Sequence, residues 1–196
     1  MQKKGKSKSY AMDLTTGSVW TKMLLFALPL MCSSMLQLLF NAADIVVVGR
    51  FVGDNSLAAV GSNTALINLL TNLFIGLSVG VNVLCARYYG AKKEQGLSDT
   101  VHTAIFVSII SGLFLNLFGV VFARRILILM STPAEVLDLA TLYLRIYFFG
   151  MTGMMVYNFG SAVLRALGDT KRPLYYLFFS GIVNVILNLL FVLVFQ

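Results

Sequence analysis

A stripe of four polar side chains, one of them an acid, lies inside the first long apolar stretch of the chain. Successive spacings of three, four and three residues place them all on one face of a helix. The four are Ser34, Gln37, Asn41 and Asp44. A carboxylate within a membrane-spanning helix costs about 3 kcal/mol. The stripe is therefore expected to face protein or water, and its acid is a candidate site for a cation or a proton.

A simpler interpretation is that Asp44 lies close enough to Arg50, at the end of the apolar stretch, to be hydrated. The other polar residues on its face favour the functional interpretation instead. Carboxylate and amide oxygens can ligate Na⁺, and a carboxyl group can hold a proton where the dielectric constant is low. Gln37 and Asn41 are the nearest such amides on the stripe.

The composition places the chain in a membrane. Hydrophobic residues make up 58% of the 196 residues and charged residues only 12%, whereas soluble domains average about 25% charged residues. The net charge of +7 does not indicate nucleic-acid binding, because the basic residues are confined to a tail and short loops. Cys32 and Cys85 lie far apart inside apolar runs, so they predict neither a disulfide framework nor a metal site.

The apolar runs predict an all-α integral membrane protein, a polytopic bundle of transmembrane helices. Residues 1–22 are interpreted as a basic cytosolic tail and residues 23–196 as the bundle. Five spans are expected, at residues 23–48, 57–86, 101–123, 139–164 and 174–195. Because the last span finishes at the end of the chain, the five helices are expected to be part of a larger bundle.

The basic residues in the loops predict the orientation. Eleven Lys and Arg residues fall in the tail and in the second and fourth loops, against four elsewhere. The positive-inside rule therefore predicts a cytosolic N-terminus for a multi-pass protein of the plasma (inner) membrane.

Polar residues also mark faces of three later predicted helices. These faces carry Asn68 and Asn72, then Met154 and Tyr157, and last Asn184 and Asn188. The first four of these are the candidates to line a substrate cavity. Each asparagine alone is better explained by a hydrogen bond to a neighbouring helix, worth about 0.6 kcal/mol. Taken together, the faces favour a central polar cavity. Met151, Met154 and Met155 are interpreted as core residues, although methionines can also form an adaptable wall for varied ligands.

Gly76–Gly80 matches the GxSxG pattern of serine hydrolases, with Ser78 at its centre. That motif requires a strand followed by a tight turn and a helix, whereas here it lies within a predicted helix. The only histidine, His102, is expected at the mouth of another span. An intramembrane serine hydrolase is thus a remote alternative, and close helix contact is the better explanation of the glycines.

Three stretches together resemble the multidrug and toxic compound extrusion (MATE) transporters. The first runs from Pro29 through the polar stripe to VVVGRFVGDNSLAAVG, and the second is ARYYGAKKEQGLSDTVHTA. The third is VLRALGDTKRPLYY, followed by GIVNVILNLLFVLVF. The resemblance implies a twelve-helix antiporter built from two six-helix halves, of which this chain would supply five helices of the N-terminal half, a MATE-like N-lobe.

The resemblance also implies a function and roles for particular residues. Such proteins export amphipathic, often cationic compounds in exchange for Na⁺ or H⁺. The family's acid on helix one corresponds to Asp44, whereas Asn188 stands where several members carry a second acid, four residues after the position of Asn184. Pro29 corresponds to the family's hinge, and a proline interrupts the helical hydrogen bonds independently of any resemblance.

Two further alternatives remain at this point. A lipid-linked oligosaccharide flippase would share the fold, but it would need more cations in its cavity than this segment supplies. The chain could also insert into the membrane without transporting anything, because half of the substrate cleft would be missing. In every case the expected partners are the bilayer, small drug-like or toxic organic molecules and the remaining helices, with no nucleic acid and no cofactor beyond the coupling ion.

Overall fold

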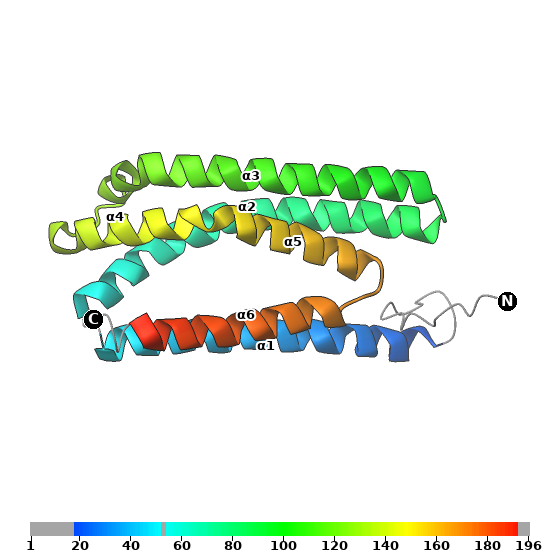
Figure 1. Ribbon diagram of the computed structural model, residues 1–196, viewed down its shortest axis with the longest axis horizontal. Coiled ribbons are helices and arrows are strands. Elements are labelled where there is room, and N and C mark those ends of the chain that lie inside the picture. The colour runs from blue at the N-terminus through cyan, green and yellow to red at the C-terminus, as the bar shows by residue number, and fades with distance from the viewer. Residues whose placement is uncertain (1–17, 52–53, 192–196) are drawn as a thin grey trace.

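The computed structural model describes residues 18–51 and 54–191, and the regular structure in this part of the chain is helical (Figure 1). The helices are α1 (Val19–Phe51), α2 (Asp54–Gly90), α3 (Glu94–Leu129), α4 (Ala134–Phe149), α5 (Met151–Ala166) and α6 (Lys171–Leu190). The predicted fold class, an all-α polytopic bundle, is confirmed. The tail and the end of the last predicted span lie outside the described residues.

The helices form two layers. Helices α2, α3, α4 and α5 pack on one another, and we call them the four-helix unit. Helices α1 and α6, the first and last in the chain, pack together as the α1–α6 pair and run in the same direction (Figure 1). Few residues join the two groups, chiefly where α2 meets α1 and where α5 meets α6.

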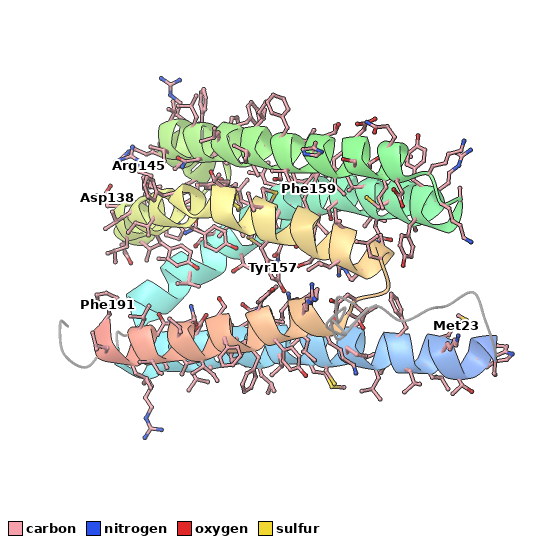
Figure 2. All side chains as sticks on the ribbon, turned by 45° about the vertical axis from the view of Figure 1, so that its right-hand side comes forward. Met23, Asp138, Arg145, Tyr157, Phe159 and Phe191 are labelled. Carbon is pink, nitrogen blue, oxygen red and sulfur yellow. The ribbon has the colours of Figure 1, made fainter. Side chains whose placement is uncertain are left out.

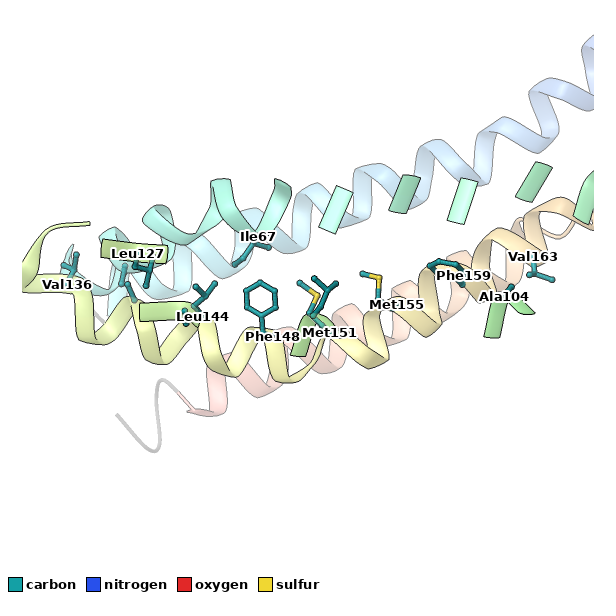
Figure 3. Close-up of a cluster of buried hydrophobic side chains, with 14 of the residues drawn as sticks. Ile67, Ala104, Leu127, Val136, Leu144, Phe148, Met151, Met155, Phe159 and Val163 are labelled. Carbon is teal, nitrogen blue, oxygen red and sulfur yellow. The ribbon is translucent and has the colours of Figure 1, made fainter. Parts of the chain in front are cut away.

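The buried core lies within the four-helix unit. Its large side chains follow α4 and α5, among them Leu144, Phe148, Met155 and Phe159 (Figure 3). The opposing faces of α2 and α3 are built mainly from small residues, which include Ala59, Ser78, Ala104, Ser108, Gly112, Gly119 and Ala123. Lipid is as apolar as a protein core, so close approach of backbones through small residues is what holds such helices together.

The predicted span at residues 139–164 is broken in the structure. Helices α4 and α5 meet at Gly150 with a bend of 45°. Four other helices of the described chain are each long and apolar enough to cross a membrane. Together α4 and α5 are also long and apolar enough for one bent span, which would make five. Gly150 lies at the bend and Gly153 follows three residues later, and paired glycines are a known cause of helix kinks.

Contacts from α3 hold this bend in place. The Nδ2 atom of Asn116 donates a hydrogen bond of 3.3 Å to the carbonyl oxygen of Phe149, at the end of α4. Gly112 lies so close to the backbone of Thr152 that a Cβ atom there would collide with it. One side of the break is therefore in contact with α3, while Phe149 and Gly150 are exposed on the other side.

One glycine also sets the spacing within the α1–α6 pair. The ring of Phe40, from α1, occupies the space that a Cβ atom would need at Gly181 of α6. Gly181 is buried, unlike most of its neighbours on α6. This contact brings the two backbones together one helical turn before the polar residues described next.

Candidate functional site

A carboxylate and two amides meet between α1 and α6. The Nδ2 atom of Asn188 donates a hydrogen bond to Oδ1 of Asp44, and it lies 3.3 Å from Oδ1 of Asn184. Asp44 is half-buried. The structure thus brings together three of the five residues predicted to couple a cation or a proton, from helices that are distant in the sequence.

Two tyrosines of α4, Tyr143 and Tyr147, lie together in the four-helix unit. The ring of Tyr143 lies 6.2 Å from that of Tyr147, whose hydroxyl group is 4.0 Å from the sulfur of Met154. The Tyr147 hydroxyl group therefore links α4 to α5. Tyr143 was not predicted from the sequence.

Oxygen atoms at this point could hold a hard cation. The described residues contain no group of three or more His, Cys, Asp or Glu side chains that would suit a transition metal. An acid and amide oxygens instead suit Na⁺, and the acid alone suits a proton. Rotation of the Asn188 amide would turn its oxygen towards a cation at Asp44.

The other two predicted coupling residues lie elsewhere on α1. Gln37 and Asn41 are exposed on the α1–α6 pair. Pro29, the predicted hinge, is buried inside a helix that continues without interruption from Val19 to Phe51. Because proline has no N–H group, the carbonyl of Leu25 lacks its usual helical partner there. The proline weakens α1 at this point without ending it.

The four residues predicted to line a substrate cavity occupy different surroundings. Asn68 and Asn72 are exposed on α2, and Met154 is half-buried near Tyr147. Tyr157 lies on the side of α5 that faces α6, where its hydroxyl group donates a hydrogen bond of 3.2 Å to the carbonyl of Pro173 (Figure 2). Of the four, only Tyr157 borders the cavity of about 410 Å³ between α3, α5 and α6.

Two asparagines that join helices were missed in the sequence. The Nδ2 atom of Asn63 in α2 donates to the carbonyl of Ala140 in α4 at 3.0 Å, and Asn82 donates to that of Ala162 in α5 at 2.8 Å. Both lie on or beside the face of α2 that also carries the buried Ile67. Their helical spacing from such apolar residues is the sequence pattern that would have identified them. Their role is structural.

The GxSxG segment is not a nucleophile elbow. Ser78 lies within α2, is buried, and donates its hydroxyl proton to the carbonyl of Ile75 at 2.7 Å. His102 is exposed at the start of α3 and bonds to Ser98 one turn earlier. The serine-hydrolase alternative is therefore wrong.

The turn between α5 and α6 is fixed by one buried acid. The Oδ1 atom of Asp169 accepts hydrogen bonds from the backbone N–H groups of Lys171 and Arg172, at 3.2 and 3.1 Å. Its Oδ2 atom lies 3.1 Å from Nε of Arg172. Gly168 has φ of 85°, which favours glycine at this position. The turn therefore holds the start of α6 against the end of the four-helix unit.

Comparison with known proteins agrees with this architecture. The MatE family profile matches residues 29–190. The chain is 37% identical over 170 residues to the probable multidrug resistance protein YoeA of Bacillus subtilis. This alignment covers 87% of the chain and 37% of YoeA. It is 31% identical over 188 residues to the probable multidrug resistance protein YpnP of the same organism, covering 95% of the chain and 42% of YpnP.

Solved structures match over a similar portion. A crystal structure of a MATE protein in the straight conformation aligns with a TM-score of 0.82 and 27% identity, over 89% of this chain and 39% of that one. A MOP superfamily transporter from Pyrococcus furiosus aligns with a TM-score of 0.83 and 26% identity, over 89% of this chain and 38% of that one. The chain spans about two fifths of the length of these relatives. The chain belongs to the MATE family, a family of multi-pass membrane transporters and not of enzymes.

Proposed function

We propose that this chain supplies the first five spans of a cation-coupled antiporter that exports amphipathic, often cationic compounds. The observation that supports this most directly is the hydrogen bond between Asn188 of α6 and Asp44 of α1. An acid among membrane-spanning helices is usually a site for an ion or a proton. The names of the relatives YoeA and YpnP support drug-like substrates.

In the proposed mechanism, the coupling ion competes with a contact that holds α1 to α6. Na⁺ or H⁺ at Asp44 would remove the negative charge to which Asn188 donates, and Asn184 would contribute a further oxygen to Na⁺. The ion would thereby shift the equilibrium between two arrangements of the α1–α6 pair. Gln37 and Asn41 would hydrate or ligate the ion along its path.

Pro29 is proposed as the position at which α1 bends. Solved MATE structures carry the descriptions "bent conformation" and "straight conformation", and the chain matches both with a TM-score of 0.82. A proline inside a spanning helix lowers the cost of such a change, because one backbone hydrogen bond is already missing.

The substrate is proposed to contact polar and adaptable side chains of the four-helix unit. Asn68 and Asn72 are exposed on α2 and available to a ligand, while Met154 and Tyr157 lie on α5. Met151 and Met155 are fully buried, so they pack the core instead. With the cytosolic N-terminus proposed from the loop charges, the protein would export these compounds across the bacterial inner membrane.

The test replaces Asp44 by asparagine and follows efflux of a cationic dye from vesicles, with Na⁺ and pH gradients imposed separately. We expect ion-driven efflux to fall on the order of ten-fold or more, since the coupling free energy passes through this acid. Asp138→Asn is the matched control, because Asp138 is exposed and forms an ion pair with Arg124 at 2.6 Å. Undiminished coupled efflux by Asp44→Asn would exclude the mechanism.

The same vesicles test whether the chain transports without further helices. Efflux by the native chain alone would show that its spans suffice, for example as an oligomer. Efflux that appears only when a second half is supplied would agree with the length of the relatives, of which the chain spans about two fifths.

A further inference from the structure

The cavity between α3, α5 and α6 is separate from the acid and amides at the α1–α6 pair. It has a volume of about 410 Å³, within the usual range of ligand sites. Its walls include Ala104 and Ser108 from α3, Val156, Gly160 and Leu164 from α5, and Tyr176 from α6.

The walls offer a ligand little polar bonding. The hydroxyl group of Ser108 donates to the carbonyl of Ile105 at 2.7 Å, and that of Tyr157 donates to the carbonyl of Pro173 at 3.2 Å. The remaining lining is aliphatic or aromatic apart from Ser161 and the hydroxyl group of Tyr176. A polar drug would lose its hydration here without adequate replacement, whereas a hydrocarbon chain would not.

The cavity is open to the side of the bundle. Its lining residues Ile105, Val156 and Tyr176 are 49%, 41% and 57% exposed. A Cβ atom added at Gly160 would meet nothing within 4 Å, so open space reaches the backbone of α5. Helices α3 and α6 are both candidate spans, so the opening lies at the depth of the bilayer hydrocarbon.

Cationic side chains lie at one end of this cavity. Leu164, in its wall, is two residues before the end of α5, and α6 begins at Lys171. Tyr176 lies five residues into α6, about 7.5 Å along the helix at 1.5 Å per residue. Lys171 is exposed, and the Arg172 guanidinium is held at the turn by Asp169. Basic groups between membrane helices are typical of sites for anionic lipid headgroups.

We propose that this cavity holds one acyl chain of an anionic phospholipid whose phosphate group lies at the turn between α5 and α6. The chain fills the apolar space beside Gly160, and the phosphate accepts hydrogen bonds from Lys171 and Arg172. Tyr175 and Tyr176, both exposed at the start of α6, lie at the depth where tyrosines commonly meet the membrane interface. The site is separate from the proposed ion site at Asp44, Asn184 and Asn188.

The experiment counts phospholipids that remain bound to the purified chain by native mass spectrometry, after exchange into detergent and addition of phosphatidylglycerol or phosphatidylcholine. Gly160→Leu fills the space with a side chain, so we expect about ten-fold less bound phosphatidylglycerol than in the native chain. Gly153→Leu is the matched control. It makes the same change on the same helix at a glycine that also meets nothing within 4 Å but does not line the cavity.

The headgroup is tested separately. The native chain should retain phosphatidylglycerol over phosphatidylcholine, and Lys171→Gln should reduce that preference. A spin-labelled phosphatidylglycerol on the native chain should show an immobilised signal that unlabelled phosphatidylglycerol displaces, which tests the site without any variant. Equal lipid retention by both glycine variants would overturn the proposal. The proposal would also be overturned if the native chain formed a dimer without bound lipid and Gly160→Leu dissociated that dimer. A second copy of the chain would then occupy the cavity.

Discussion

The four-helix unit and the α1–α6 pair are held together in different ways. In the first, large core side chains on α4 and α5 pack against small residues of α2 and α3. In the second, most side chains are exposed, and the contacts between the helices include the Phe40 ring on Gly181 and the Asn188 amide on Asp44. In the most apolar window of α3, 28% of residues are buried, against 6% in that of α1.

This difference separates stability from response. A packed core has one arrangement and resists deformation. A pair of helices that lies outside this core, and whose contacts include a charged hydrogen bond, can change its arrangement when that charge is neutralised. The four-helix unit is therefore suited to carry the fold, and the α1–α6 pair to respond to an ion.

The largest effect on stability is expected from Phe148→Ala. Phe148 is 1% exposed, and its ring packs against Gly119. The cavity left behind should lower the free energy of unfolding by about 3–5 kcal/mol, measured in mixed detergent micelles. Phe149→Ala changes the next residue, which is 75% exposed, and should leave the free energy of unfolding nearly unchanged. Equal losses would mean that the core is not where stability resides.

A smaller effect is expected from Gly181→Ala in the α1–α6 pair. The added methyl group collides with Phe40, and overpacking of this kind costs about 1–2 kcal/mol. Spin labels on α1 and α6 should report a larger distance between the helices. Gly153→Ala, at a glycine with open space, is the control for loss of helix flexibility. An unchanged interhelical distance would show that Gly181 does not set the spacing.

The asparagine that joins α2 to α4 is expected to contribute less. Asn63→Ala removes its hydrogen bond to Ala140, and such bonds between membrane helices average about 0.6 kcal/mol. The Oδ1 atom of Asn63 is buried without a partner among the described residues, so its removal offsets part of that loss. Asn68→Ala, at an exposed position one turn further along α2, should not alter unfolding. A loss above about 2 kcal/mol would contradict this account of Asn63.

The smallest effect is expected at the outer end of the four-helix unit. Arg124 and Asp138 form an ion pair of 2.6 Å, but their side chains are 54% and 82% exposed. Arg124→Gln should therefore change the free energy of unfolding by less than about 0.5 kcal/mol, and added salt should reduce even that. Arg125→Gln provides the comparison, because the adjacent arginine takes no part in that pair.

Much of the fold could be predicted because membrane helices leave strong signals. Long apolar runs and the placement of cations are properties of the sequence itself. The break at Gly150 could not be predicted in the same way. A helix can carry Gly150 and Gly153 without breaking, and here the bend depends on contacts from Asn116 and Gly112 in another helix.

The residue types of the candidate site could be predicted from the sequence, but the contact between them could not. Asp44 stands out as an acid in an apolar stretch, and Asn184 and Asn188 lie on one face of α6. Their meeting depends on which helices pair, and that information lies in the contact of Phe40 with Gly181. The exposure of Gln37 and Asn41 could not be deduced, because helical spacing places residues on a face without showing what the face meets.

The hydrogen bond between Asp44 and Asn188 also has a consequence for biosynthesis. The two residues are 144 positions apart, and a ribosome adds about 5–20 residues per second, so roughly 10 s separate their synthesis. During that interval the newly made first span carries an acid whose partner has not yet been translated. The insertion machinery must therefore accommodate this nascent segment near water or protein until α6 emerges to receive it.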